Sequence, residues 1–219
     1  MNPRRTRILL ASASPRRRRL ISWLGVDADV THVTTPEDLS AGLVPSRLAM
    51  RIAQEKALAV PADDRLVLAC DTIVVLDDAV LGKPADSGDA RRMLRLLSGT
   101  EHSVMTGVAL RAPASQAVVS FSVTTRVRMR ELTEAEIDAW IAQGECLGCA
   151  GGYNIERHLA SVDPDECFNN VAGLPLCHVY VALRNHEAGA TVEGLTSPIA
   201  RCDAALGRTC LLGPRVCEV

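Results

Sequence analysis

A turn rich in serine and arginine stands near the N-terminus, directly after a short apolar segment. It runs from Ser12 to Pro15, and Arg16 and Arg17 follow it. Ser14 is a good N-cap and Pro15 suits the first helical position, so a helix should begin there. The free N–H groups of a first turn favour an anion. Two arginines placed against the helix dipole indicate a ligand such as phosphate, although a solvated basic helix face is the alternative.

A carboxylate lies in the middle of a long apolar segment. Residues 65–76, RLVLACDTIVVL, are typical of a strand buried on both faces, and Asp71 is at their centre. A buried carboxylate is costly unless it is paired or binds a metal. We therefore expect Asp71 to be a general base or a metal ligand, with a structural aspartate held by backbone N–H groups as the alternative.

Two lysines are candidates for the same site. Residues 45–60 predict an amphipathic helix, and Lys56 falls on its apolar stripe, in line with Leu48 and Ile52. It either snorkels at the helix end or points its ammonium group into a cleft. Lys83 follows a short return strand that begins at Val80, and this turn could bring it back toward Asp71.

Glu37 and Asp38 follow Pro36 in a stretch with few periodic signals. Glu37 is a candidate metal carboxylate, and a loop acid in water is the structural alternative.

Composition excludes several classes of protein. The 219 residues are 47% hydrophobic and 23% charged, as in an ordinary globular protein. A net charge of −2 argues against a nucleic-acid polymer as partner, and no apolar run approaches the ~18 residues of a membrane span. The apolar part of the N-terminus is too short for a signal peptide, so we expect a cytoplasmic protein.

Helical and strand patterns alternate along the chain, which predicts one α/β domain. Ser87 is expected to cap a helix that ends at Gly99, and strands are expected over residues 102–110 and 117–129. Thr133 and Glu136 form the pattern of a capping box. We place the domain at residues 1–185, and residues 186–219 form a tail rich in Cys, Gly and Pro with no clear periodicity.

Eight cysteines are many for such a chain, but a disulfide framework is not expected in a chain of this length without an export signal. Cys146 and Cys149 have the spacing of a zinc knuckle and could join Cys202 and Cys210, which would make this a zinc-organised interaction protein. Nothing in the sequence fixes that geometry, and the spacing up to Cys217 fits no zinc pattern, so we expect no zinc site.

The motifs, in their order, resemble the Maf family, which is named for septum-formation inhibition and consists of nucleoside triphosphate pyrophosphatases. The resemblance covers roughly residues 7–185. It rests on Ser12-Ala13-Ser14-Pro15-Arg16-Arg17, Lys56-Ala57, Asp71-Thr72-Ile73-Val74, Gly82-Lys83-Pro84, Ser98-Gly99, His102, Thr106-Gly107, Ala150-Gly151 and Gly173-Leu174-Pro175-Leu176.

The resemblance implies a single α/β domain, built on a mixed, twisted sheet flanked by helices, with a deep cleft between two lobes. It implies hydrolysis of a nucleoside triphosphate to the monophosphate and pyrophosphate, with Mg²⁺ or Mn²⁺ as cofactor. It leaves a homodimer open. A nucleotide-binding regulator of cell division without turnover is the rival function.

The resemblance also assigns roles to residues. Asp71 matches the proton acceptor, Lys56 and Lys83 match the two cleft lysines, and Glu37 falls where the family has a metal-binding acid. The substrate-binding set is Ser12, Ser14, Arg16, Arg17, Thr72 and Glu156.

The base preference is divided between two branches of the family. Arg16 is typical of the dTTP/UTP branch, whereas Glu156, with Cys149 before Ala-Gly, is typical of the 7-methylguanosine triphosphate branch. A carboxylate only accepts hydrogen bonds, and guanine and cytosine offer amino donors, whereas uracil and thymine flank one donor with carbonyl oxygens. We therefore expect a guanine-type or cytosine-type base, with dTTP or UTP as the alternative. Glu156 could instead be a surface acid paired with Arg157.

Overall fold

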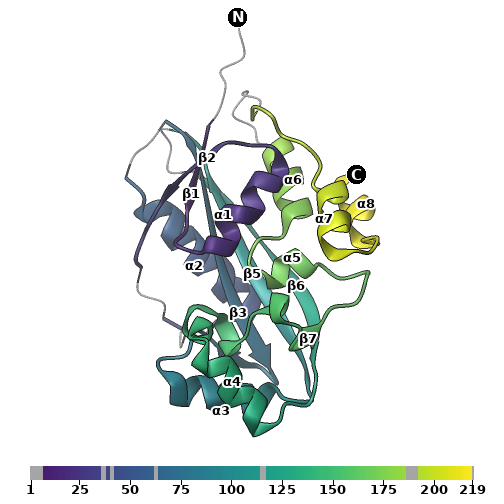
Figure 1. The fold of residues 1–219 in the computed structure, drawn as a ribbon. Coiled ribbons are helices and arrows are strands. Elements are labelled where there is room, and N and C mark those ends of the chain that lie inside the picture. The colour runs from purple at the N-terminus through teal and green to yellow at the C-terminus, as the bar shows by residue number, and fades with distance from the viewer. Residues whose placement is uncertain are drawn as a thin grey trace, which may run out of the picture.

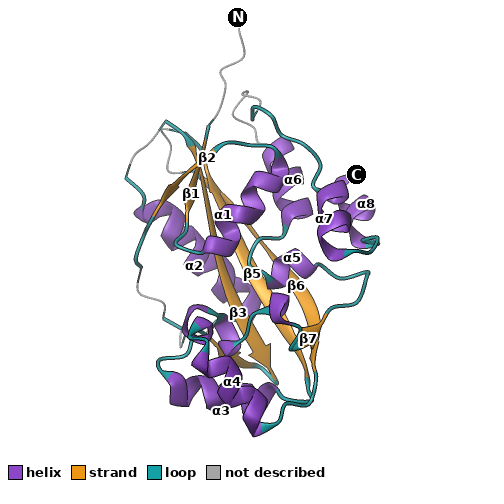
Figure 2. Cartoon of the chain, viewed as in Figure 1, coloured by secondary structure: helices purple, strands orange, loops and turns teal. Residues whose placement is uncertain are grey.

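The chain forms a mixed α/β domain around one seven-stranded sheet (Figures 1 and 2). The computed structural model describes residues 7–35, 38–39, 42–61, 64–113, 117–185 and 192–218. Its strands are β1 (Ile8–Ala11), β2 (Ala28–Thr31), β3 (Leu66–Leu76), β4 (Ala79–Leu81), β5 (Glu101–Arg111), β6 (Val118–Met129) and β7 (Ala160–Ser161).

The helices of the described chain are short, apart from α2 and α3. They are α1 (Pro15–Ile21), α2 (Pro45–Ala59), α3 (Ser87–Leu97), α4 (Glu134–Ala142), α5 (Phe168–Val171), α6 (Leu176–Arg184), α7 (Ile199–Leu206) and α8 (Leu212–Cys217). Four 3₁₀ turns accompany them, η1 (Ser22–Leu24), η2 (Glu145–Gly148), η3 (Ala150–Gly152) and η4 (Ile155–Arg157).

The strand order is β2-β1-β3-β5-β6-β7, and β4 pairs with β3 beyond the end of β1. Strands β1, β2 and β3 are parallel, and the other pairs are antiparallel, so the sheet is mixed as expected. On one edge of β3, β1 pairs only as far as Ala69, and β4 begins to pair at Val74. Residues 70–73 therefore lie opposite neither strand on that edge.

Alternation along β1 and β3 directs successive side chains to opposite faces of the sheet. Leu10 and Leu68 belong to the large core under α1, whereas Leu9 and Val67 pack with the alanines of α2. Figure 2 shows α2 behind the sheet and α1, α5 and α6 in front of it. Asp71 and Thr72 must therefore face α2 and α5, respectively.

Helix starts follow local hydrogen-bonding chemistry. Ser14 caps α1 and its hydroxyl accepts from the backbone N–H of Arg17, as predicted. The predicted capping box of Thr133 opens α4. The prediction that Ser87 caps α3 is wrong, because the carboxylate of Asp86 accepts from the N–H of Asp89 and Ser87 is already helical. Both residue types are good caps, so their order alone did not decide between them.

The C-terminal segment, which shows no clear periodicity, contains two short helices packed beside α6 (Figure 1). Val192 joins the main core, and the N–H of Thr196 donates to the carbonyl oxygen of Leu24 at 2.8 Å. No helix in the described ranges is both long and apolar enough to cross a membrane.

Helix α2 lies very close to the sheet at Gly107 of β5. A Cβ atom added there would lie 2.1 Å from the backbone oxygen of Ala49. Gly107→Ala should therefore force α2 away from the sheet and lower the free energy of unfolding by about 1–3 kcal/mol, measured by urea denaturation.

Gly148→Ala is the matched control, because a Cβ at Gly148 would meet no atom within 4 Å. It should unfold at nearly the wild-type urea concentration. Equal midpoints for Gly107→Ala and wild type would contradict the close packing of α2.

Candidate active site

A large cavity opens where β3 lacks a neighbour between β1 and β4. It has a volume of about 890 Å³, within the usual range for small-molecule sites. Its walls come from the turn after β1, from the middle of β3, and from the segment of residues 144–157. Ligands commonly bind outside the carboxyl ends of strands in open α/β sheets, and β1 ends here.

The base of the cavity holds an ion pair between α2 and β3. Lys56 Nζ donates to Asp71 Oδ1 at 2.5 Å, and their side chains are only 11% and 7% exposed. The apolar stripe of α2 carries Lys56 to the sheet, as its spacing predicts, and the alternation of β3 turns Asp71 toward it. The buried carboxylate is therefore stabilised by a cation.

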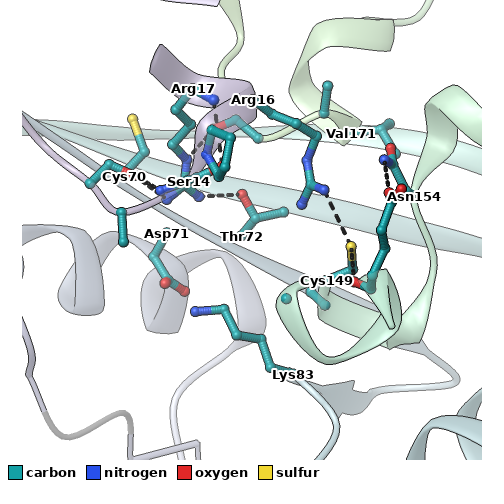
Figure 3. A pocket seen from close by; sticks show the side chains of 18 of the residues that line it. Ser14, Arg16, Arg17, Cys70, Asp71, Thr72, Lys83, Cys149, Asn154 and Val171 are labelled. Atoms are coloured by element: carbon teal, nitrogen blue, oxygen red, sulfur yellow. Dashed lines mark hydrogen bonds between the residues drawn. The ribbon is translucent and has the colours of Figure 1, made fainter. Parts of the chain in front are cut away.

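Lys83 approaches the same carboxylate from a different element. It follows β4, and Figure 3 shows its ammonium group pointing toward Asp71. The N–H of Gly151 donates to the carbonyl oxygen of Gly82 at 3.0 Å, which ties the Lys83 turn to the 144–157 segment. The return of Lys83 toward Asp71 is thus as predicted.

Arg17 connects three walls of the cavity. Its Nε donates to the carbonyl oxygen of Gly173 at 2.7 Å, its Nη2 to Thr72 Oγ1 at 2.9 Å, and its Nη1 to Ser12 Oγ at 3.4 Å. All three partners are neutral, so they hold the guanidinium in place without cancelling its charge. Ser12 and Thr72 are thereby brought to Arg17, while Ser14 lines the cavity beside its cap.

The threonine of this network has support from deeper in the core. Thr106 donates to the carbonyl oxygen of Asn170 at 3.0 Å, so its oxygen can accept from Thr72, 2.9 Å away. Arg17, Thr72 and Thr106 therefore form one directed chain of hydrogen bonds. The place of Thr106 in this chain was missed from sequence, because Thr72 and Thr106 meet only when β3 and β5 pair.

Arg16 extends across the cavity to the opposite wall. Its Nη1 contacts Cys149 Sγ at 3.3 Å, as Figure 3 shows. Burial raises the pKa of the Cys149 thiol, and the nearby Arg16 charge acts in the opposite direction. The thiol is a neutral partner, so Arg16, like Arg17, keeps a positive charge in the cavity.

A buried pair fixes the 144–157 segment to the sheet. His102 Nε2 and the Tyr153 hydroxyl lie 2.7 Å apart, and Trp140 Nε1 donates to the carbonyl oxygen of Gly152 at 2.7 Å. Burial lowers the pKa of His102 to about 4, so the imidazole is neutral near pH 7. His102 therefore acts here as a hydrogen-bonding partner of Tyr153.

Two ion pairs line the rim of the cavity. Glu156 pairs with Arg19, and Arg157 pairs with Glu145, where its hydrogen bond lowers the pKa of the Glu145 carboxyl. The alternative prediction that Glu156 pairs with Arg157 is wrong, because Glu156 pairs with Arg19. Arg19 was missed from sequence, although it follows Arg16 by three residues and so shares a helix face with it.

The charge of the cavity wall is predominantly positive. The described lining contains six cationic side chains and three carboxylates. They are Arg16, Arg17, Arg19, Lys56, Lys83 and Arg157 against Asp71, Glu145 and Glu156. The arrangement suits a ligand with several negative charges.

The described residues offer a divalent metal one carboxylate ligand at the base of the cavity, Asp71. Mg²⁺ and Mn²⁺ prefer oxygen ligands, and Mg²⁺ is commonly held by one or two carboxylates plus substrate phosphates. Asp71 fits that pattern as one carboxylate in the lining of the cavity. Glu37, the other predicted metal ligand, lies outside the described residues.

The alternative to the expectation of no zinc site was a combination of Cys146 and Cys149 with Cys202 and Cys210, and these cysteines do not come together. Cys149 lines the large cavity and Cys146 lies beside it in η2, whereas Cys202 and Cys210 lie at a second, smaller cavity beneath the C-terminal helices.

Breaking the Lys56–Asp71 pair on one side should be strongly destabilising. Lys56→Met removes the cation that is hydrogen-bonded to the buried Asp71 carboxylate, so the free energy of unfolding should fall by about 3–5 kcal/mol. The double variant Lys56→Met/Asp71→Asn removes both charges and should lose less stability than Lys56→Met alone. Urea denaturation of the wild type, both single variants and the double variant gives the coupling free energy between the two side chains.

Additive losses would show that the two groups do not interact. A Lys56→Met variant with the wild-type midpoint would show that the pair is well solvated.

The comparisons with known proteins agree with this geometry. Residues 7–186 match the family model described as "Maf-like protein". The protein named dTTP/UTP pyrophosphatase from Geobacter metallireducens is 41% identical over 190 residues, which cover 85% of this chain and 99% of that protein. The protein of the same name from Anaeromyxobacter dehalogenans strain 2CP-C is 46% identical over 182 residues, 81% of this chain and 93% of that protein.

Among solved structures, the Ham1 protein of Staphylococcus aureus superposes with a TM-score of 0.39 at 12% identity, covering 57% of this chain and 72% of that one. The family model spans all the elements that build the cavity, from β1 to α6. This chain belongs to the Maf-like protein family.

Proposed function

We propose that this protein is a nucleoside triphosphate pyrophosphatase, which hydrolyses its substrate to the nucleoside monophosphate and pyrophosphate. The observation that carries the proposal is the Asp71 carboxylate at the base of a cavity whose walls are rich in cations. The names of the relatives support the same reaction.

The cationic walls suit the triphosphate. Arg16 and Arg17 have neutral hydrogen-bond partners, so their charges are available to the phosphate oxygens. Lys83 comes from the other side of the cavity. Cations held in place before the reaction stabilise the charge that develops on the leaving pyrophosphate at little reorganisation cost.

Asp71 is the proposed general base for the attacking water. In the proposed reaction, water attacks the α-phosphorus, the bond to the bridging oxygen of the β-phosphate breaks, and pyrophosphate leaves with that oxygen. Asp71 orients the water and accepts its proton, and Lys56 holds the carboxylate in position through its hydrogen bond. A divalent cation held by Asp71 and the triphosphate would neutralise further phosphate charge.

Asp71→Asn tests this function. The amide cannot accept the proton, so the rate of pyrophosphate release should fall at least ~10²-fold, the usual contribution of a general base. The assay uses a panel of nucleoside triphosphates with Mg²⁺ or Mn²⁺ and separates pyrophosphate from orthophosphate. Full activity in a folded Asp71→Asn protein would refute the assignment, and sequential release of orthophosphate would refute the reaction type. Binding without turnover would instead support the regulator of cell division.

Lys83→Met and Lys56→Met should also impair turnover in the same assay, because each removes a cation from the cavity. Arg18→Met is the matched control, since Arg18 is an exposed cation of α1 outside the cavity lining. It should keep nearly wild-type kinetics. If Lys83→Met and Lys56→Met both kept wild-type kinetics, as the control should, the two lysines would lie away from the triphosphate.

For the base, we propose a uracil-type or thymine-type nucleotide. The expected guanine-type or cytosine-type preference is not supported by the relatives, whose names specify dTTP and UTP. The carboxylate of Glu156 does not stand alone, because it is paired with Arg19 on the cavity wall. Together the pair offers a donor beside an acceptor, which can meet a carbonyl oxygen and the adjacent N–H of uracil or thymine. Guanine and cytosine also carry a donor beside an acceptor, so the names of the relatives carry the choice of base.

Arg19→Met tests the role of the pair. It leaves a bare carboxylate that meets the base carbonyl with repulsion, so the kcat/KM ratio of UTP to CTP should fall by tenfold or more, as expected for a mismatched buried hydrogen-bonding group. Adding Glu156→Gln in the Arg19→Met background should restore the ratio, because one glutamine amide both donates and accepts.

An unchanged ratio in Arg19→Met would show that the base does not contact the pair. Preference of the wild type for GTP or CTP would reject the proposed base.

A further inference from the structure

A buried threonine of β5 is linked to an arginine of the cavity wall through one other side chain. Thr106 is fully buried and is not among the residues that line the cavity, so a ligand there does not reach it. Its hydroxyl contacts Thr72, which does line the cavity and which accepts from Arg17. Figure 3 shows the hydrogen bond from Arg17 to Thr72, next to Asp71 on the same strand. Along this chain of hydrogen bonds, Thr106 acts on the cavity through Thr72 and Arg17.

The hydroxyl protons in this chain have a fixed direction. The hydroxyl of Thr106 donates to the carbonyl oxygen of Asn170 at 3.0 Å, and this uses its only proton. The Thr106 oxygen then accepts from the hydroxyl of Thr72, 2.9 Å away, which uses the proton of Thr72. Thr72 therefore presents only lone pairs to Arg17 Nη2, 2.9 Å away on its other side.

The carbonyl oxygen at the start of the chain is held by the sheet. It belongs to Asn170, a fully buried residue of α5. Asn170 Nδ2 donates to the backbone carbonyl oxygens of Val104 in β5 and Val123 in β6, at 3.1 and 3.0 Å. The position of the acceptor, and with it the direction of the Thr106 proton, is therefore fixed before any ligand enters the cavity.

Arg17 keeps N–H groups for a phosphate. A guanidinium has more N–H donors than the three hydrogen bonds that hold Arg17 to Ser12, Thr72 and Gly173. These three bonds set the plane and rotation of the group, so they decide where its other N–H groups point. Because arginine binds phosphate best when its planar fork is aligned with the phosphate oxygens, this orientation governs affinity.

We propose that Thr106 is a positioning residue for the triphosphate: its hydroxyl keeps Thr72 an acceptor toward Arg17 and so holds the guanidinium in its binding orientation. The inference rests on the proposed function, since it takes the cavity as the site of a triphosphate. Without the Thr106 oxygen, the Thr72 proton loses its acceptor and can turn toward Arg17. Two donors would then face each other, and the guanidinium would move out of its position.

Thr106→Val tests this role, because it removes the hydroxyl and keeps the branched shape of the side chain. The affinity for inorganic tripolyphosphate, measured by titration calorimetry on the full-length protein, should fall about tenfold, the scale for a buried hydrogen-bonding group that loses its partner. The KM for a nucleoside triphosphate should rise by a similar factor in the pyrophosphate-release assay. Wild-type affinity in folded Thr106→Val would overturn the proposal.

Thr125→Val is the matched control. Thr125 is also a fully buried threonine of the sheet, and its hydroxyl also donates to a backbone carbonyl oxygen at α5, that of Cys167 at 3.2 Å. Among the described residues, no hydrogen bond joins it to Thr72 or Arg17. It should lose stability to urea much as Thr106→Val does, yet bind tripolyphosphate like the wild type. An equal loss of affinity in both variants would reduce Thr106 to a support of α5 and overturn the proposal.

Two smaller substitutions separate the hydroxyl from the packing around it. Thr106→Ser keeps the hydroxyl and should retain most of the affinity for tripolyphosphate, whereas Thr106→Ala should lose it. Both remove the same methyl group, so their comparison decides the question even if Thr106→Val fails to fold. Equal affinities in the two variants would overturn the proposal.

The dependence on Arg17 is tested by a double variant. In the Arg17→Met background, Thr106→Val should cause no further loss of affinity, because the hydroxyl acts through that guanidinium. A full additional loss would show that Thr106 acts by another route and would overturn the proposal.

Failure of the proposed function is seen separately in the wild type. Protein that binds tripolyphosphate but releases no pyrophosphate from any nucleoside triphosphate would reject the hydrolase, while the affinities of the Thr106 variants would still decide the role of this residue. Wild-type protein without measurable affinity for tripolyphosphate would overturn the role of Thr106 as well.

Discussion

The ion pair between Lys56 and Asp71 is the constraint on which the arrangement of the domain depends. A carboxylate in the middle of the central strand is tolerated only with a cation beside it, and that cation comes from α2. Helix α2 must therefore lie close to the sheet, which the bare backbone of Gly107 permits. The alanines of the same helix stripe complete the contact, so the packing of α2 and the position of the ion pair are one requirement.

Arg17 plays a corresponding part on the other face of the sheet. It joins the turn after β1, the side chain of Thr72 and the carbonyl oxygen of Gly173, which lies 156 residues away in sequence. Asp71 and Thr72 are neighbours in β3 and point to opposite faces, yet both border the cavity because β3 has a free edge there. The gap between β1 and β4 thus lets two faces of the sheet serve one site.

The sequence predicts the parts of the site that local periodicity controls. The stripe of α2 predicted the place of Lys56, the apolar run of β3 predicted the buried Asp71, and Ser14 predicted the start of α1. It could not predict pairs that depend on tertiary packing, such as Arg19 with Glu156, 137 residues apart. That omission led to the guanine-type expectation, since a lone carboxylate and a carboxylate paired with a guanidinium offer a base different hydrogen bonds.

Helix α5 lies between the large cavity and the C-terminal helices and connects them. Asn170 is fully buried, and its Nδ2 donates to the carbonyl oxygens of Val104 and Val123, so this short helix is fixed on the sheet. On one side, Gly173 accepts from Arg17 at the cavity wall; on the other, Asn169 donates to the Cys202 sulfur. A shift of the C-terminal helices would act on α5 through Asn169. Within α5, Asn170 carries the carbonyl oxygen that accepts from Thr106, and Gly173, which accepts from Arg17, follows the helix closely. The tail, although it lies outside the residues that match the family model, therefore supports one wall of the nucleotide cavity.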